Sequence, residues 1–214
     1  MTGLRECPDN WEYSDHPRKS ELYGRAQQLL LQLRRLRPDQ QLEAAKDTRP
    51  YHNSYFESFT PEGFEYFAGH YRGEDFRCLN TYRVVIRQDP RVGHPPALVP
   101  RNMDRLSQDI ERAIGKLDLR VPEAGNLLAD VNTFLGYARV ATAIFVYFLE
   151  IHPYANGNGH MARAILLLLF ARHQVYPRGW KIDPRPADPP YSNLISMYRN
   201  GNKDPLVNYI ISHI

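Results

Sequence analysis

The sequence predicts a mainly α-helical fold, a helical bundle with one small β-hairpin. Two stretches, residues 127–151 and 161–173, are apolar on most helical faces, which is typical of helices at the centre of a bundle. A third stretch, residues 100–117, repeats its apolar side chains at helical spacing along one face. Residues 81–87 are instead a run of β-branched and aromatic side chains followed by turn residues, so a strand or short hairpin is expected there.

The remaining elements follow in chain order. An N-terminal extension, residues 1–48, is expected to contain one helix, because leucines recur at near-helical spacing in residues 20–37 and Pro38 ends the pattern. The main domain is assigned to residues 49–214. Aromatic residues are dense between residues 49 and 77, and glycines interrupt any period, so short helices and loops are expected. Two short helices near residues 191–199 and 205–212 close the chain.

Composition limits the classes of protein to consider. The chain has 214 residues, 43% hydrophobic and 24% charged, as in an ordinary globular domain. A net charge of +3 is too small to indicate nucleic-acid binding. We expect no membrane segment, because nothing approaches the roughly 20 uniformly apolar residues of a membrane span and no cationic leader opens the chain. With only Cys7 and Cys78, the cytoplasm is the expected compartment.

Residues 152–160, called the motif loop below, read His-Pro-Tyr-Ala-Asn-Gly-Asn-Gly-His and join the two central helices. The second helix begins at or just after the glycines, so amides without intrahelical acceptors point into the loop. Glycines allow close approach and positive φ, and a helix N-terminus favours phosphate. The pattern therefore predicts an anion cradle, which Arg163, one turn into the helix, could also reach.

His152 ends the first central helix, immediately before Pro153. A neutral imidazole at this position could accept a proton from an attacking hydroxyl group. Asn-Gly pairs are also ordinary turn signals, however, and a lone histidine before a proline is more often structural. Spacing alone leaves both interpretations open.

The run from His152 to Arg163, HPYANGNGHMAR, resembles the signature of Fic (filamentation induced by cyclic AMP) domains, His-x-Phe-x-Asp/Glu-Gly-Asn-Gly-Arg-x-x-Arg. The run from Ala68 to Arg72 is similar to the family's Ala-Gly-x-Tyr-Arg, and the likeness extends over roughly residues 50–212. The resemblance implies a Fic-like helical bundle with a β-hairpin flap. The flap is bounded here by Thr81 and His94 and covers residues 81–94.

The resemblance also implies protein AMPylation, in which a protein adenylyltransferase, a nucleotidyltransferase, moves AMP from ATP to a Ser, Thr or Tyr hydroxyl of a target protein and releases pyrophosphate. His152 would be the general base. The backbone amides of Gly157, Asn158 and Gly159 would hold the α- and β-phosphates, and Arg163 would meet the terminal phosphates.

Three positions depart from the family signature. Asn156 replaces the acidic residue that helps to hold Mg²⁺, so a weakened magnesium site is expected. His160 replaces the first arginine; it is counted with the nucleotide-binding residues, but it reaches less far and is only partly charged at neutral pH. Tyr154 replaces the phenylalanine, and we expect it to anchor the core. Two alternatives stay open, a Fic-fold transferase with another phosphate-containing donor and a nucleotide-binding module with impaired turnover.

The resemblance suggests partners as well. The flap of the family lays a segment of the target protein alongside itself by strand addition. An inhibitory pattern of the family, Ser/Thr-x-x-x-Glu-Gly/Asn, matches residues 58–63, which makes Glu62 a candidate inhibitor that would pair with Arg163. Pro61 fits poorly inside a helix, so we favour Pro61 and Glu62 as the start of a helix under the flap. Without an internal inhibitor, an antitoxin-like partner is expected.

Overall fold

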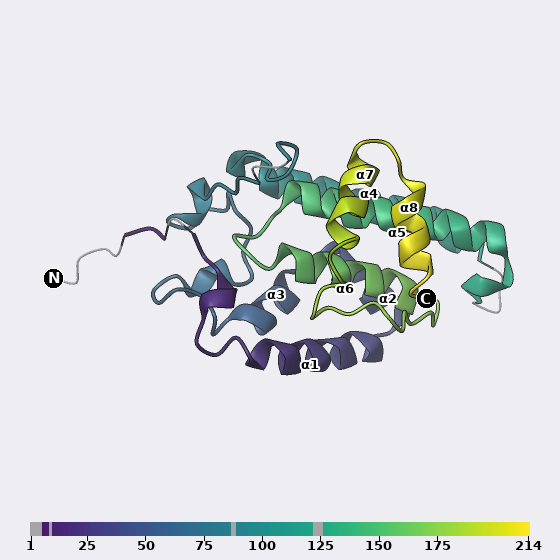
Figure 1. The fold of residues 1–214 in the computed structure, drawn as a ribbon, viewed down its shortest axis with the longest axis horizontal. Coiled ribbons are helices and arrows are strands. Elements are labelled where there is room, and N and C mark those ends of the chain that lie inside the picture. The colour runs from purple at the N-terminus through teal and green to yellow at the C-terminus, as the bar shows by residue number, and fades with distance from the viewer. Residues whose placement is uncertain (1–5, 9, 87–88, 122–125) are drawn as a thin grey trace.

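The computed structural model describes residues 6–8, 10–86, 89–121 and 126–214 and is mainly helical (Figure 1). The α-helices among the described residues are α1 (Glu21–Arg35), α2 (Pro38–Lys46), α3 (Arg49–Phe56), α4 (Val99–Asp118), α5 (Val131–Ile151), α6 (Asn158–Ala171), α7 (Tyr191–Arg199) and α8 (Asp204–Ile211). Short 3-10 turns are η1 (Tyr13–Asp15), η2 (Glu65–Phe67), η3 (Leu79–Thr81), η4 (Pro96–Leu98) and η5 (Leu127–Ala129). The helical fold class predicted from the sequence is confirmed.

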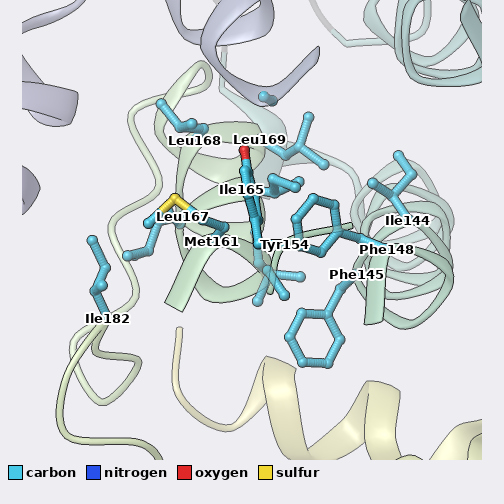
Figure 2. Close-up of a cluster of buried hydrophobic side chains, with 14 of the residues drawn as sticks. Ile144, Phe145, Phe148, Tyr154, Met161, Ile165, Leu167, Leu168, Leu169 and Ile182 are labelled. Atoms are coloured by element: carbon cyan, nitrogen blue, oxygen red, sulfur yellow. The ribbon is translucent and has the colours of Figure 1, made fainter. Parts of the chain in front are cut away.

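Helix α6 forms the centre of the bundle. It packs against α1, α2 and α5, and all of its residues except Gly159 are buried. Figure 2 shows Tyr154, from the motif loop, among Phe148 of α5 and Ile165 of α6. The Tyr154 ring is fully buried, and its hydroxyl lies 2.7 Å from Oγ1 of Thr48. Tyr154 therefore anchors the core, and its hydroxyl has the partner that burial requires.

Helix α5 bears on the expectation that the chain has no membrane segment. Its 21 residues, with a mean hydropathy of 1.5, make it the one helix of the described residues that could span a membrane by length and composition alone. Half of the apolar 18-residue stretch of α5 is buried inside the fold, where α5 packs against α4 and α6. The apolar side chains of α5 thus serve the core of the bundle, as expected for a central helix.

The N-terminal extension differs from the expectation of a single helix. The predicted helix is α1, and the chain does break before Pro38, but a second helix, α2, begins at that proline. A proline at the first helical position lacks only an N–H that would have no intrahelical acceptor, so Pro38 starts a helix as readily as it ends one. Helix α2 packs against α4 and α6, and Trp11 also lies in the core. The boundary between residues 48 and 49 stays a prediction.

The β-hairpin expected for the flap is not seen, and no strand forms in the part of the chain that the structure describes. Gly93 and His94 instead donate backbone hydrogen bonds to the carbonyls of Glu150 (2.9 Å) and Ile151 (3.2 Å) at the end of α5. Residues 90–96 also include three prolines, which have no N–H for a ladder. Residues 87–88 lie outside the described residues. The prediction of a strand or short hairpin from the β-forming residues 81–87 was therefore wrong.

A disulfide joins Cys7 to Cys78. It ties the start of the described chain to the residue before η3. Disulfides persist in oxidising compartments and are rare in the cytoplasm. The compartment stays a prediction.

Candidate functional site

His152 lies at the C-terminal end of α5 in the left-handed conformation, with φ of 53° and ψ of 60°. This conformation is unfavourable by about 1–2 kcal/mol for a residue with a Cβ atom, so contacts must hold it in place. Its N–H donates to the Phe148 carbonyl at 3.0 Å, and its own carbonyl accepts from Nε of Arg72 at 2.8 Å. The turn ends α5 and sets His152 at the edge of a pocket.

The buried guanidinium of Arg72 connects the segments around His152. Besides the His152 carbonyl, it donates to the carbonyls of Tyr82 (3.1 Å), His94 (3.1 Å) and Ile151 (3.0 Å). Burial lowers the pKa of Arg72 to about 10, so the group stays cationic at neutral pH. The family resemblance included residues 68–72 but gave Arg72 no role. An arginine that binds backbone carbonyls has no sequence pattern of its own by which it could have been found.

The pocket beside His152 has a volume of about 340 Å³. Residues of the flap, among them Asp89, and Ser192, Ser196 and Arg199 of α7 line it. Burial, and then the nearby Arg72, lower the pKa of His152 to about 4. The imidazole is therefore neutral at pH 7. Its Nδ1 is fully buried, on the side of the ring that faces the Leu149 backbone. A neutral imidazole at the edge of a pocket can accept a proton at a ring nitrogen that faces the pocket.

Arg199 was not singled out as a site residue. Its side chain lines the pocket and pairs with Asp89 (3.3 Å) and with Glu150 (3.5 Å). Arg91 adds a bond from Nη1 to the Arg199 carbonyl at 2.6 Å. These contacts join the flap to α7, which gives the His152 pocket two connected walls.

Gly157 and Asn158, at the start of α6, both have structural contacts. Gly157 is the N-cap of α6, with φ of 79°, and a Cβ atom there would lie 2.3 Å from Cε2 of Phe56. The side chain of Asn158 exchanges two hydrogen bonds of 2.9 Å with the backbone of Tyr154. In contrast, the backbone amides of Asn158 and Gly159 donate no hydrogen bond to any described residue. Two amides at the N-terminus of α6 thus remain available to an anion.

Arg163 and His160 are both buried close to these amides. Arg163 donates to the Ile182 carbonyl from Nε (2.8 Å) and Nη2 (2.5 Å), while its Nη1 lies 3.1 Å from the position of a Cβ on Gly159. Nε2 of His160 is 3.4 Å from Oδ1 of Asp183. Burial lowers the pKa of His160, so it is mainly neutral at pH 7 and does not supply the charge of the family's arginine.

Asn156 contacts residues 11–13, called the N-terminal strap below. Its Nδ2 donates to the Trp11 carbonyl at 2.6 Å and to Oε2 of Glu12 at 3.0 Å. The ring of Tyr13 meets that of His160 edge to face, with centroids 5.3 Å apart. Sequence reasoning missed this contact, because 144 or more residues separate the partners and no pattern joins them.

The residues around Asn156 do not fit a magnesium ion. The amide oxygen, the only atom of this side chain that could bind a hard cation, accepts a hydrogen bond from the Gly157 amide at 2.7 Å. The amide nitrogen faces the two oxygens of the strap. No group of three or more His, Cys, Asp or Glu side chains suited to a metal occurs in the described ranges.

Glu62, the candidate inhibitor, lies in an exposed turn between α3 and η2. Neither Pro61 nor Glu62 starts a helix, which corrects the expectation of one under the flap. Arg163 is buried and uses two nitrogens on the Ile182 carbonyl. The inhibitory role of Glu62 stays a prediction.

Comparison with known proteins gives one match. Residues 67–170 match the model of the Fic/DOC family. The matched region contains the flap, α4, α5, the motif loop and nearly all of α6, and it excludes the N-terminal strap. The chain has no significant match among curated proteins or solved structures.

Proposed function

Residues 67–170 of this chain form a Fic/DOC-family region, and from this premise we propose that the chain is a protein adenylyltransferase. Its reaction would be AMPylation, the transfer of AMP from ATP to a Ser, Thr or Tyr hydroxyl of a target protein. The hydroxyl oxygen attacks the α-phosphorus, and its proton passes to the His152 imidazole. The bond from the α-phosphorus to the bridging oxygen breaks, and pyrophosphate leaves with that oxygen.

The observation that carries the proposal is the state of His152. The imidazole borders an open pocket and is neutral at pH 7, because its pKa is lowered to about 4. A base of such low pKa accepts a proton only weakly in the ground state. It would be more basic beside the negative charge of bound phosphates, which raises the pKa of a nearby histidine.

Anion binding is supported at the other end of the motif loop. The free amides of Asn158 and Gly159 stand at the N-terminus of the fourteen-residue helix α6, where the helix dipole favours negative charge. Nη1 of Arg163 lies next to Gly159, so it could join the amides on one phosphate group. No step of the proposal requires a metal at Asn156.

Docking of the target protein on the flap is supported by exposure. Val85 is 77% exposed and Ile86 38% exposed, and residues 83–86 belong to no sheet. A groove of about 310 Å³ runs beside them, lined by Arg83, Val84 and residues 93–96. An extended segment of the target could pair with the backbone of residues 83–85, as in strand addition.

The test uses ATP labelled separately at the α- and γ-phosphates, incubated with the purified chain and an extract of candidate target proteins. We expect the α-label on protein, with the mass of AMP added to a hydroxyl side chain. His152→Ala should lower the transfer by about 10²- to 10⁴-fold and leave the melting temperature and ATP affinity close to wild type, because a general base acts on the hydroxyl. Transfer of the γ-label instead would identify a different phosphate-transfer reaction.

A binding module with impaired turnover is the second candidate, and one observation favours it. Arg163 is occupied by the Ile182 carbonyl, while His160 is neutral, so the site supplies less positive charge to a triphosphate than the family signature implies. This alternative predicts ATP binding without transfer of either label. Equal ATP affinity in wild type and His152→Ala, with no modified protein in any extract, would establish it.

A further inference from the structure

We propose that Asn156 is a latch for the chain's own N-terminus and not a metal ligand. Its side-chain amide ties the N-terminal strap, residues 11–13, across the motif loop, and release of the strap opens the phosphate side of the site. The regulatory meaning of the latch rests on the proposed function; the latch itself does not.

The contacts explain why an amide stands where the family has a carboxylate. Asn156 donates two hydrogen bonds from Nδ2, to the Trp11 carbonyl at 2.6 Å and to the Glu12 carboxylate at 3.0 Å. A carboxylate has no proton to donate at neutral pH. An aspartate at residue 156 would lose both bonds and would place a second negative charge beside Glu12. The departure from the signature therefore matches the donor that the strap requires.

The strap covers the part of the motif loop that leads to the free amides. Tyr13 packs its ring against His160 and also against Phe56, with centroids 5.2 Å apart. His160 is only 4% exposed beneath this ring. Lifting Tyr13 would uncover His160, which follows Gly159 directly, and so would widen the approach to the cradle.

One end of the strap is fixed, which makes it a hinged cover. Trp11 is 3% exposed, and only its carbonyl takes part in the latch. Its backbone N–H donates to the Tyr82 hydroxyl and its indole Nε1 donates to the Phe59 carbonyl, both at 2.8 Å. The disulfide at Cys7 adds a covalent anchor. Glu12, by contrast, is exposed. Opening therefore occurs at Glu12 and Tyr13 while Trp11 stays in the core.

Hydrogen–deuterium exchange of the full chain, without nucleotide or target protein, tests the latch. The variants are Asn156→Asp, Glu12→Ala, and the pair Asn156→Asp with Glu12→Gln. We expect Asn156→Asp to speed exchange of the amides of Asp15 and His16, which donate to the carbonyls of Glu12 and Tyr13, by about ten- to a hundredfold, the effect of losing a charge-assisted hydrogen bond. Glu12→Ala should speed it less. The paired variant should return toward wild type, because glutamine removes the repulsion and can donate to the new carboxylate.

Circular dichroism melting shows whether each variant is folded, and Glu12→Ala changes an exposed side chain, so it keeps the test valid if Asn156→Asp misfolds. Unchanged exchange of the Asp15 and His16 amides in both single variants would overturn the latch. Titration with Mg²⁺ alone is a second measurement. Binding of Mg²⁺ to wild type that Asn156→Ala abolishes would make Asn156 a metal ligand and also overturn the proposal.

The outcome is independent of the proposed function. Exchange of the strap is measured with no donor present, so a chain that transfers nothing can still have the latch. A chain that transfers AMP can equally lack it. If both proposals hold, Glu12→Ala should also bind ATP severalfold more tightly than wild type.

Discussion

Gly157 and Gly159 are two residues apart in the motif loop, but their surroundings differ. Gly157 packs against Phe56, whereas Gly159 belongs to the proposed anion site, and alanine substitutions can separate the two effects. Gly157 has φ of 79°, and a Cβ atom there would lie 2.3 Å from Cε2 and 2.7 Å from Cζ of Phe56. Gly159 has ordinary helical geometry, and its Cβ would meet only the guanidinium of Arg163, with Nη1 at 3.1 Å and Cζ at 4.0 Å.

The expected magnitudes follow from these contacts. For Gly157→Ala, the left-handed conformation costs about 1–2 kcal/mol and the overpacking against Phe56 about 1–3 kcal/mol. The sum, about 2–5 kcal/mol, lowers the melting temperature of a chain of this size by about 5–15 °C. Gly159→Ala should change the free energy of unfolding by less than about 1 kcal/mol, because alanine favours a helix over glycine. Its methyl group would instead crowd the free amide and Arg163, and weaken ATP binding by about ten- to a hundredfold.

Thermal melting by circular dichroism and calorimetric titration with ATP measure the two effects on the same samples. Gly157→Ala with a wild-type melting temperature would refute the packing argument for the N-cap of α6. Gly159→Ala with wild-type stability and undiminished ATP affinity would refute the anion site at the start of that helix. Each variant serves as the control for the other.

Three further predictions concern titration, oxidation and the core. The pKa of His152 falls from 6.5 when unfolded to about 4 when folded, so the unfolded chain binds more protons in that window. Stability contributed by neutral His152 should therefore fall as the pH drops from 6.5 to 4, and His152→Gln should flatten this part of the pH dependence of unfolding. Reduction of the bond between Cys7 and Cys78, which closes a loop of 71 residues, should lower the unfolding free energy by about 2–5 kcal/mol. Tyr154→Phe should cost about 1–3 kcal/mol, because Thr48 loses its buried partner.

Each of these has a simple check. Urea unfolding from pH 4 to 7 tests the histidine, and an identical pH profile in wild type and variant would contradict the assignment of its proton. A thiol assay before and after denaturation tests the disulfide; two reactive thiols in the freshly isolated, unreduced chain would contradict it. For the tyrosine, Thr48→Val combined with Tyr154→Phe is the control, because removal of both hydroxyls should cost less than the sum of the two single changes.

The sequence predicted the helices best where apolar spacing was strong and the ends were marked. Helix α7 was expected at residues 191–199 and is found there, and both central helices lie within a few residues of their predicted bounds. Helix α2 was missed because Pro38 can mark either end of a helix, and only packing on α4 and α6 decides between them. The flap was misjudged because β-propensity needs a partner strand, whereas Gly93 and His94 bond to the end of α5.

The candidate site could be located from the sequence only where its residues are close along the chain. Spacing placed His152 at the end of one helix and the motif glycines at the start of the next, as the structure has them, while their roles in catalysis stay predictions. The strap was invisible to this reasoning, because Trp11 and Asn156 are 145 residues apart. Burial of His160 was invisible too, since the aromatic rings that cover it come from η1 and α3.

The four carbonyl contacts of Arg72 have a mechanical consequence for the whole site. One planar guanidinium joins the end of α5, the start of the flap and the end of the flap, so displacement of one of these segments would strain the hydrogen bonds to the other two. Under the proposed function, a target segment bound at either end of the flap would be connected through Arg72 to the backbone of His152. Lysine could not replace this arginine, because a single ammonium group cannot span four acceptors in a planar fork. Alignment of the proposed base would thus depend on a residue eighty positions away in the chain.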